Sequence, residues 1–334
     1  MKDIFVVSDN IFSPLGTTTA ENFSRLKAGV SAVRRHDRPE MAGEPFYAAL
    51  FDADMTDGAS GPYTKFEQLL LASISEVLET GEVDPRDPRT ILILSTTKGN
   101  ISLLETDAAG AGRAAANPAL DRRIALSTSA RLIAGHFHFV NVPIIISNAC
   151  ISGILALVTA MRLLRSGSYD TAVVAGADTI SKFVLSGFGS FQAISPGPCR
   201  PFDKLRDGIN LGEGAGTVVL SSLEKYRGGI RLRGGAVGND ANHISGPSRT
   251  GQELCQVINK SLAEAGVTPG DIGFISAHGT ATIYNDEMEA RAALLLGNLQ
   301  ALVRKYTVKH FNKLKDAYFK ARFFSQFTCD TFLQ

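Results

Sequence analysis

The chain has 334 residues, enough for one large domain or two halves, and 44% of them are hydrophobic against 20% charged. This composition excludes a disordered, collagen-like or coiled-coil chain. With 34 basic and 33 acidic residues the formal net charge is +1, so charge gives no argument for binding nucleic acid or a membrane surface. Four cysteines are too few for a disulfide framework, and no apolar run reaches the roughly 18 residues of a membrane span. We therefore expect a cytoplasmic protein with no membrane insertion and no nucleic acid partner.

Short β-branched runs alternate with longer segments of helical periodicity, which predicts the α/β fold class. The expected strands, in chain order, are Ile4–Val7, Thr90–Leu94, Pro143–Ser147, Thr171–Ala175, Thr217–Ser221, Ile230–Val237 and Ile272–Ala277. The expected helices are Thr64–Glu79, Gly153–Ser166 and Gly251–Ala265. The helix over Gly153–Ser166 is apolar around most of its circumference, so we expect it to be buried. The first apolar run, Ile4–Val7, is too short for a signal peptide and predicts a strand instead.

The composition changes near residue 298. Residues 299–334 hold seven basic and two acidic residues, six of the 19 Phe and no Gly. We expect an N-terminal half over residues 1–225, a partial C-terminal half over residues 226–298, and an atypical basic, Phe-rich tail over residues 299–334. Both halves contain a short strand that leads into a reactive side chain. This similarity indicates either two related halves or merely the repeated strand–turn–helix units of any α/β chain.

Cys150 is the leading candidate for chemistry. It follows the strand predicted at Pro143–Ser147 and precedes the buried helix, whose positive dipole end favours the nucleophilic thiolate. Small neighbours such as Ala149 and Gly153 permit a tight turn that exposes the sulfur. A buried structural cysteine is the alternative interpretation. His278 ends the last predicted strand and is a candidate acid/base or oxyanion donor, or else a structural histidine.

Other motifs point away from nucleotides and metals. The Gly-rich segment 212–216 precedes a β-branched run and does not open a helix, as a dinucleotide or ATP site requires. It favours tight backbone packing instead. His136 and His138 are only a weak indication of a metal site, and no zinc-ligand or Walker spacing is present. We expect no metal.

Several motifs together resemble the β-ketoacyl-acyl carrier protein synthases, condensing enzymes of the thiolase fold. These motifs are Ser147–Gly153, Pro198–Asp203 with Arg206–Gly208, Gly212–Gly216, and Ala277–Thr282 with Asn285, Asp286 and Glu289. Ser95–Gly99 and Gly246–Ser248 are also similar to the family. The resemblance extends from about residue 3 to about residue 293. It implies two related α/β halves in a layered αβαβα arrangement, with the C-terminal half incomplete.

The resemblance also implies roles in decarboxylative condensation. Cys150 would accept an acyl group from a thioester, and its backbone N–H would contribute to an oxyanion hole. His278 would be one of two histidines that stabilise the enolate formed when malonyl-carrier protein loses CO₂. Thr280 and Thr282 would bind the pantetheine arm of acyl carrier protein, so no separate cofactor is expected. The side chains expected to support an active-site Lys are Glu289 and Asp286, and Phe188 and Phe191 are either acyl-pocket walls or apolar core.

The sequence departs from the family after His278. The family's Lys, Gly-His and Gly-Phe-Gly motifs have no counterpart there, and the only later histidine is His310. We therefore expect a truncated or frame-shifted chain in which acylation of Cys150 persists and condensation is impaired. The alternatives are a non-catalytic condensing-enzyme fragment or binding subunit, and a Cys/His hydrolase.

The resemblance implies acyl carrier protein as a partner, and a homodimer formed through the strand near Thr171–Ala175 and neighbouring helices. Carrier proteins are acidic, so a basic rim is expected. The candidates are Arg200, Lys204 and Arg206. These side chains instead form internal ion pairs with Asp203 and Asp207 in the alternative interpretation.

Overall fold

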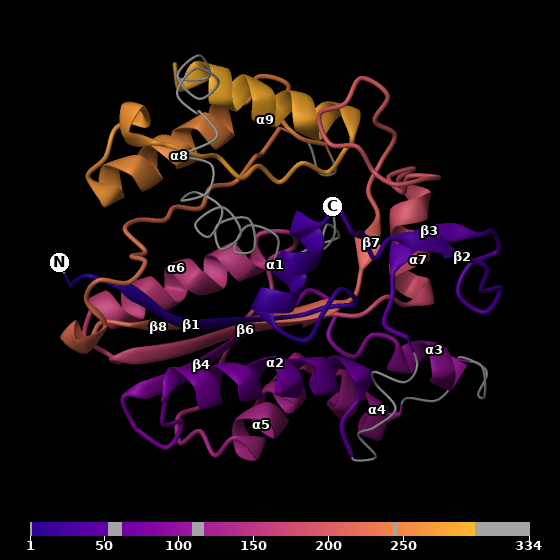
Figure 1. Ribbon diagram of the computed structural model, residues 1–334. Coiled ribbons are helices and arrows are strands. Elements are labelled where there is room, and N and C mark those ends of the chain that lie inside the picture. The colour runs from indigo at the N-terminus through magenta and orange to yellow at the C-terminus, as the bar shows by residue number, and fades with distance from the viewer. Residues whose placement is uncertain (1, 53–61, 109–116, 243–245, 298–334) are drawn as a thin grey trace. The chain divides into compact units, whose positions relative to one another are not determined.

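The computed structural model describes residues 2–52, 62–108, 117–242 and 246–297 (Figure 1). The described residues fall into two units, the first from residues 2–198 and 210–232 and the second from residues 199–209 and 233–297. The predicted boundary at residues 225/226 stays a prediction. The predicted tail, residues 299–334, lies outside the described residues.

A five-stranded sheet with the order β1-β8-β6-β4-β5 forms the centre of the first unit. Its strands are β1 (Phe5–Phe12), β4 (Thr90–Ser95), β5 (Ile144–Ile146), β6 (Thr171–Asp178) and β8 (Gly214–Ser221). Strand β4 pairs in parallel with β5 and β6, whereas β8 runs antiparallel to β6 and β1. All five strands predicted for this unit are confirmed. Because β4, β5 and β6 are parallel, their carboxyl ends lie at the same edge of the sheet.

Helices cover both faces of this sheet. Helix α2 (Lys65–Gly81) contacts β1, β6 and β8, and α5 (Leu126–His136) lies beside it. Helix α6 (Ser152–Arg165) contacts β4, β5 and β6 from the other face (Figure 1). Phe66, Leu70, Ile74 and Val77, which recur at helical spacing in α2, are buried, and Leu78 is half-buried. The expected burial of α6 is also confirmed. A capping box between Thr64 and Glu67 begins α2.

A second, three-stranded sheet in the first unit has the order β2-β3-β7. Its strands are β2 (Arg34–His36), β3 (Phe46–Ala49) and β7 (Leu211–Gly212). Glu213, between β7 and β8, is buried and accepts hydrogen bonds from the N–H groups of Phe51 and Ile180, each at 3.2 Å, and from Lys65 Nζ at 2.7 Å. The Gly-rich segment thus lies in strands around a buried carboxylate and opens no helix, as predicted.

The remaining elements of the first unit are short. They are α1 (Thr19–Lys27), α3 (Leu103–Ala108), α4 (Pro118–Ile124), α7 (Lys182–Ser190) and the 3₁₀ turn Glu224–Tyr226.

The second unit contains two packed helices, α8 (Gln252–Ala265) and α9 (Ile283–Leu295), and the 3₁₀ turn Pro269–Asp271. Gly251 precedes α8 with φ +72°, and a Cβ there would lie 2.7 Å from the backbone of Met288 and of Ala292 in α9. This close approach requires glycine. All three predicted helices of the chain are confirmed to within two residues at each end.

Two predicted strands are wrong. In Ile230–Val237 only residues 230–232 contact a strand, through Val6 N–H to Ile230 O at 2.8 Å, Leu232 N–H to Ile4 O at 2.9 Å and one isolated bridge. Ile272–Ala277 forms neither a strand nor a helix. A β-branched run becomes a strand only where it pairs with another strand, and none of the described strands pairs with Ile272–Ala277.

The strand expected at a dimer contact is also placed differently. Strand β6 is paired with β4 on one side and with β8 on the other, so Thr171–Ala175 has no open edge for a second copy. Among the described strands, the one at the edge of that end of the sheet is β5, which pairs there with β4 alone. Among the described residues, no helix is both long and apolar enough to cross a membrane.

Candidate active site

Cys150 lies in a tight turn between β5 and α6. The turn includes Ala149 with φ +44°, an uncommon conformation for a residue with a Cβ, and an isolated bridge joins Asn148 to Cys150. Ile151 N–H donates to Asn148 O and Ser152 N–H donates to Ala149 O, each at 3.2 Å. Cys150 is exposed. The predicted nucleophile turn is therefore present, with the sulfur-bearing residue at the surface.

Ser152 holds this turn from inside. Its Oγ accepts the N–H of Asn148 at 2.7 Å and donates to Ala149 O at 2.8 Å, and the residue is fully buried. Helix α6 begins at Ser152. The start of a 14-residue helix therefore lies two residues after Cys150, where its dipole favours negative charge.

The next two strands of the sheet, β4 and β6, also lead into polar side chains, which we call the strand-end cluster: Thr96 and Lys98 after β4, and Asp178 at the end of β6. Thr96 Oγ1 donates to Asp178 Oδ1 at 3.0 Å, and Lys98 Nζ lies 3.4 Å from Asp178 Oδ2. The side chains of Lys98 and Asp178 are only 12% and 17% exposed. Burial raises the pKa of Asp178, and the nearby Lys98 charge and the hydrogen bond from Thr96 oppose that rise.

In the second unit, His278 and Gly279 are bound to Glu289 of α9. Glu289 Oε1 accepts the backbone N–H of His278 at 2.7 Å, and Oε2 accepts that of Gly279 at 2.8 Å. Asn285 Nδ2 donates to Glu289 Oε2 at 3.2 Å. The carboxylate thus orients the backbone that carries His278. The sequence did not reveal these partners of Glu289.

Thr280 and Thr282 lie directly after this contact, with their hydroxyl oxygens 2.8 Å apart. Ala281 between them has φ +56°, and its carbonyl accepts the N–H of Gly208 at 3.0 Å. The chain therefore makes a sharp bend that leaves both threonines half-buried.

Asp286 is almost fully buried and lies near Arg206. Its Oδ2 accepts the N–H of Phe202 at 2.7 Å and lies 3.5 Å from Arg206 Nε. Arg206 also lies 3.7 Å from Glu287. Arg206 is therefore an internal ion-pair partner, although of α9 and not of Asp203 or Asp207.

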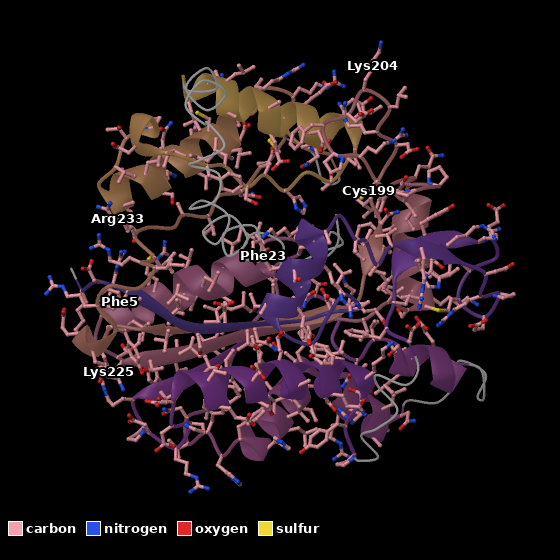
Figure 2. The ribbon with its side chains drawn as sticks, in the orientation of Figure 1. Phe5, Phe23, Cys199, Lys204, Lys225 and Arg233 are labelled. Atoms are coloured by element: carbon pink, nitrogen blue, oxygen red, sulfur yellow. The ribbon has the colours of Figure 1, made fainter. Side chains whose placement is uncertain are left out.

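The other two basic candidates differ from each other. Arg200 lies 3.6 Å from Asp207 and donates to Leu205 O at 2.6 Å, so the internal pairing is confirmed for it. Lys204 is exposed, and Figure 2 shows its side chain projecting from the ribbon. Lys204 is the candidate still suited to an acidic partner.

Phe188 lies near the end of α7 and is half-buried, whereas Phe191 follows the helix and is 70% exposed. Phe191 is therefore not apolar core in the first unit. His136 Nδ1 lies 3.1 Å from the hydroxyl of Tyr63. Over the described ranges, no group of three or more His, Cys, Asp and Glu side chains is arranged to hold a metal ion.

The structure brings most of the predicted site residues into two local groups. Cys150 lies in the first unit, and the second unit gathers His278, Thr280, Thr282, Asp286 and Glu289 around the start of α9. The sequence analysis missed Asp178. The signal available was an acidic residue at the end of a strand that is otherwise apolar and buried.

Comparisons with known proteins agree with this architecture. Residues 1–226 match the family "Beta-ketoacyl synthase, N-terminal domain" and residues 230–301 match "Beta-ketoacyl synthase, C-terminal domain". A 3-oxoacyl-[acyl-carrier-protein] synthase 2 of Vibrio cholerae is 28% identical over 86% of this chain and 75% of its own length. A putative polyketide β-ketoacyl synthase 1 of Streptomyces halstedii is also 28% identical, over 86% of this chain and 76% of its own.

Among solved structures, the ishigamide ketosynthase/chain length factor is similar with a TM-score of 0.78 and 29% identity, over 88% of this chain and 77% of that one. The fold expected from the resemblance, α/β and thiolase-like, is therefore confirmed. The residues matched by the two family domains include both the turn of Cys150 and the segment of His278. The chain belongs to the β-ketoacyl synthase family, the condensing acyltransferases of fatty acid and polyketide synthesis.

Proposed function

We propose that this chain forms an acyl-enzyme on Cys150 and uses it for decarboxylative condensation with malonyl-carrier protein. The observation that carries the proposal is the exposed Cys150 on a strained turn before a buried helix. A non-glycine residue with positive φ is kept only where the surrounding structure requires it, and such positions concentrate at functional sites. The bonds of Ser152 supply that requirement here.

The reaction proceeds in two stages. The Cys150 thiolate attacks the carbonyl carbon of an acyl thioester, and the carrier thiol leaves. A malonyl thioester then loses CO₂, and the resulting enolate is stabilised by a hydrogen bond from His278. The enolate carbon attacks the acyl-Cys150 carbonyl, with the backbone N–H of Cys150 stabilising the developing oxyanion. Collapse of that intermediate releases the Cys150 thiolate and leaves a 3-ketoacyl group on the carrier.

The second unit serves the carrier-bound substrate in this proposal. Thr280 and Thr282 hydrogen-bond the pantetheine arm, and Glu289 fixes the backbone from which His278 projects. The partner is acyl carrier protein, whose acidic surface suits the exposed Lys204. In this proposal, Phe188 and the largely exposed Phe191 form walls of the pocket that binds the acyl chain.

Residues 1–334 contain one of the two histidine motifs that the family resemblance implies, and no matching Lys motif. Loss of an acid/base group typically costs about 10²–10⁴ in rate. We therefore expect this chain to acylate Cys150 faster than it decarboxylates malonyl-carrier protein. The same observation favours a second candidate function, a non-catalytic subunit that binds a partner synthase.

Intact-protein mass spectrometry tests the proposal. The chain is mixed with an acyl-carrier protein thioester, beside Cys150→Ala. An acyl adduct on the parent and none on Cys150→Ala supports the proposal. A folded, monodisperse chain that forms no adduct contradicts it and favours the binding role. Release of CO₂ from malonyl-carrier protein then measures the second stage.

We also propose that two copies associate along the open edge of β5. In the part of the chain that the structure describes, this strand pairs with β4 alone, and the nearby Val140 and Val142 are 59% and 78% exposed. An open strand edge beside exposed apolar side chains is a surface that normally requires a partner. Val142→Lys should shift the sedimentation coefficient toward that of a monomer. Val30→Lys, at another exposed valine, should not, and equal behaviour of the two variants would contradict the contact.

A further inference from the structure

The segment Ser95–Gly99 has no role in the proposed reaction, yet it contributes two of the three residues of the strand-end cluster. Around Thr96 the backbone folds back on its own side chain, because Gly99 N–H donates to Thr96 Oγ1 at 3.1 Å. The same hydroxyl donates to Asp178. Asp178 therefore holds the turn after β4 through two side chains, Thr96 and Lys98.

The turn after β4 is hydrogen-bonded to β5, the strand that precedes Cys150. The backbone N–H of Thr96 donates to the carbonyl of Ile146 at 3.3 Å. Ile146 is the last residue of β5, and Cys150 follows it by four residues. A displacement of Thr96 thus acts on the fixed end of the Cys150 turn, whose other end is fixed by Ser152 at the start of α6.

The two charged side chains of the cluster, Lys98 and Asp178, have little contact with water. Lys98 and Asp178 are each less than a fifth exposed, so removal of one charge takes a compensating charge away from a poorly solvated group. Such a group is expected to move toward water or change its protonation state. Either response changes the contacts that hold the turn after β4. A buried ion pair at this place is therefore a means of fixing geometry more than a source of stability.

We propose that the strand-end cluster positions the nucleophile: Asp178 and Lys98 fix Thr96, and Thr96 fixes the end of β5 from which Cys150 is presented. The inference rests on the proposed function, in which Cys150 is acylated. Asp178 and Lys98 are positioning residues and touch neither substrate nor the reacting sulfur.

The test compares two aspartates near opposite ends of β6. Asp178→Asn removes the negative charge of the cluster, keeps the positive charge of Lys98, and changes the shape of the side chain little. Asp170→Asn is the matched control, because Asp170 lies just before β6, pairs with Arg89 at 2.9 Å and likewise connects β6 to the segment before β4. Two rates are measured at Cys150 by peptide mass spectrometry: alkylation by iodoacetamide and acylation by an acyl-carrier protein thioester. Melting temperatures are recorded for every variant.

We expect Asp178→Asn to lower both rates at Cys150 about tenfold, since small displacements of a reacting group have large kinetic effects. Asp170→Asn should change them less than about twofold, whatever it does to the melting temperature. Equal rates in the two folded variants would overturn the inference. The double variant Asp178→Asn/Lys98→Met removes both charges and should recover at least about threefold of the lost rate. Failure to recover would overturn the role of the ion pair.

Thr96→Val keeps the inference testable if Asp178→Asn does not fold. It removes the hydroxyl and leaves both charges in place, and it should slow alkylation at Cys150 at least about threefold with a retained melting transition. A rate within twofold of the parent would refute positioning through Thr96. Failure of the proposed function is recognised separately. In that case the parent chain is alkylated at Cys150 but takes up no acyl group, and the alkylation comparison between variants still decides the inference.

Discussion

Glu67 of α2 is the centre of a buried network whose contribution to stability can be estimated. The carboxylate is fully buried and accepts hydrogen bonds from Arg123 Nη1 at 2.5 Å, Ser129 Oγ at 2.7 Å and Asn100 Nδ2 at 3.1 Å. It also accepts the N–H of Thr64 at 2.9 Å, which closes the capping box of α2. Burial raises the pKa of Glu67, but these hydrogen bonds outweigh burial and lower it from 4.5 to about 2.

A folded-state pKa near 2 means that the folded chain binds this proton less readily than the unfolded chain does. The resulting stabilisation is present above pH 4.5 and is lost as the pH falls through the window from 4.5 to about 2. At about 1.4 kcal/mol per pH unit, its magnitude at pH 7 is about 3 kcal/mol.

Glu67→Gln should therefore lower the free energy of unfolding at pH 7 by roughly 3–5 kcal/mol, because it leaves the Arg123 guanidinium partly buried without a carboxylate. The difference between parent and variant should shrink by about 2 kcal/mol at pH 3. Urea unfolding followed by far-ultraviolet circular dichroism at both pH values measures this. Glu79→Gln, at an exposed site of the same helix, should change stability by less than about 0.5 kcal/mol. A Glu67→Gln deficit that is equal at pH 3 and pH 7 would refute the reasoning.

Three further substitutions test the site and the second unit. Glu289→Gln should lower malonyl decarboxylation about tenfold and leave acylation of Cys150 within twofold, because the amide cannot accept both N–H groups of His278 and Gly279. Equal losses in both assays would contradict that division. Ser152→Ala should slow acylation of Cys150 about tenfold, since it removes the two hydrogen bonds that Ser152 Oγ makes to the turn; an unchanged rate would argue against the turn as a determinant. Gly251→Ala should destabilise the packing of α8 on α9 by at least about 1 kcal/mol, seen as faster amide exchange confined to the second unit. Unchanged exchange there would show that the contact is not tight.

The sequence predicts those parts of the fold whose signal is local. Helix α2 combines a capping box with apolar residues at helical spacing, and β4 and β8 are apolar runs buried on both faces. The short strands β2 and β3 were missed, because three or four residues carry too little periodicity to separate a strand from a loop. Helix α9 was missed because its apolar residues occur all around the helix, so they show no face.

The errors at Ile230–Val237 and Ile272–Ala277 have a different cause. Both runs have the composition of strands, but strand formation depends on a neighbour that no local pattern reveals. The same limit applies to the site. The turn of Cys150 was predictable because its small residues and the following helix are adjacent in sequence. The partners of Glu289 were not, because they depend on where α9 lies relative to the bend at Gly279.

The residues that hold the turn of Cys150 differ in whether the sequence reveals them. Cys150 is presented by a turn that stores strain at Ala149, of order 1–3 kcal/mol, so its geometry persists only while both ends of the turn are held. One end is held within the same motif, by Ser152, and is therefore visible in the sequence. The other end is held by β4 through Thr96, and behind it by Asp178 of β6. These residues are about fifty and thirty positions away, and only the parallel order of β5, β4 and β6 brings them to one edge of the sheet. The proposed positioning of Cys150 therefore depends on the topology of the sheet.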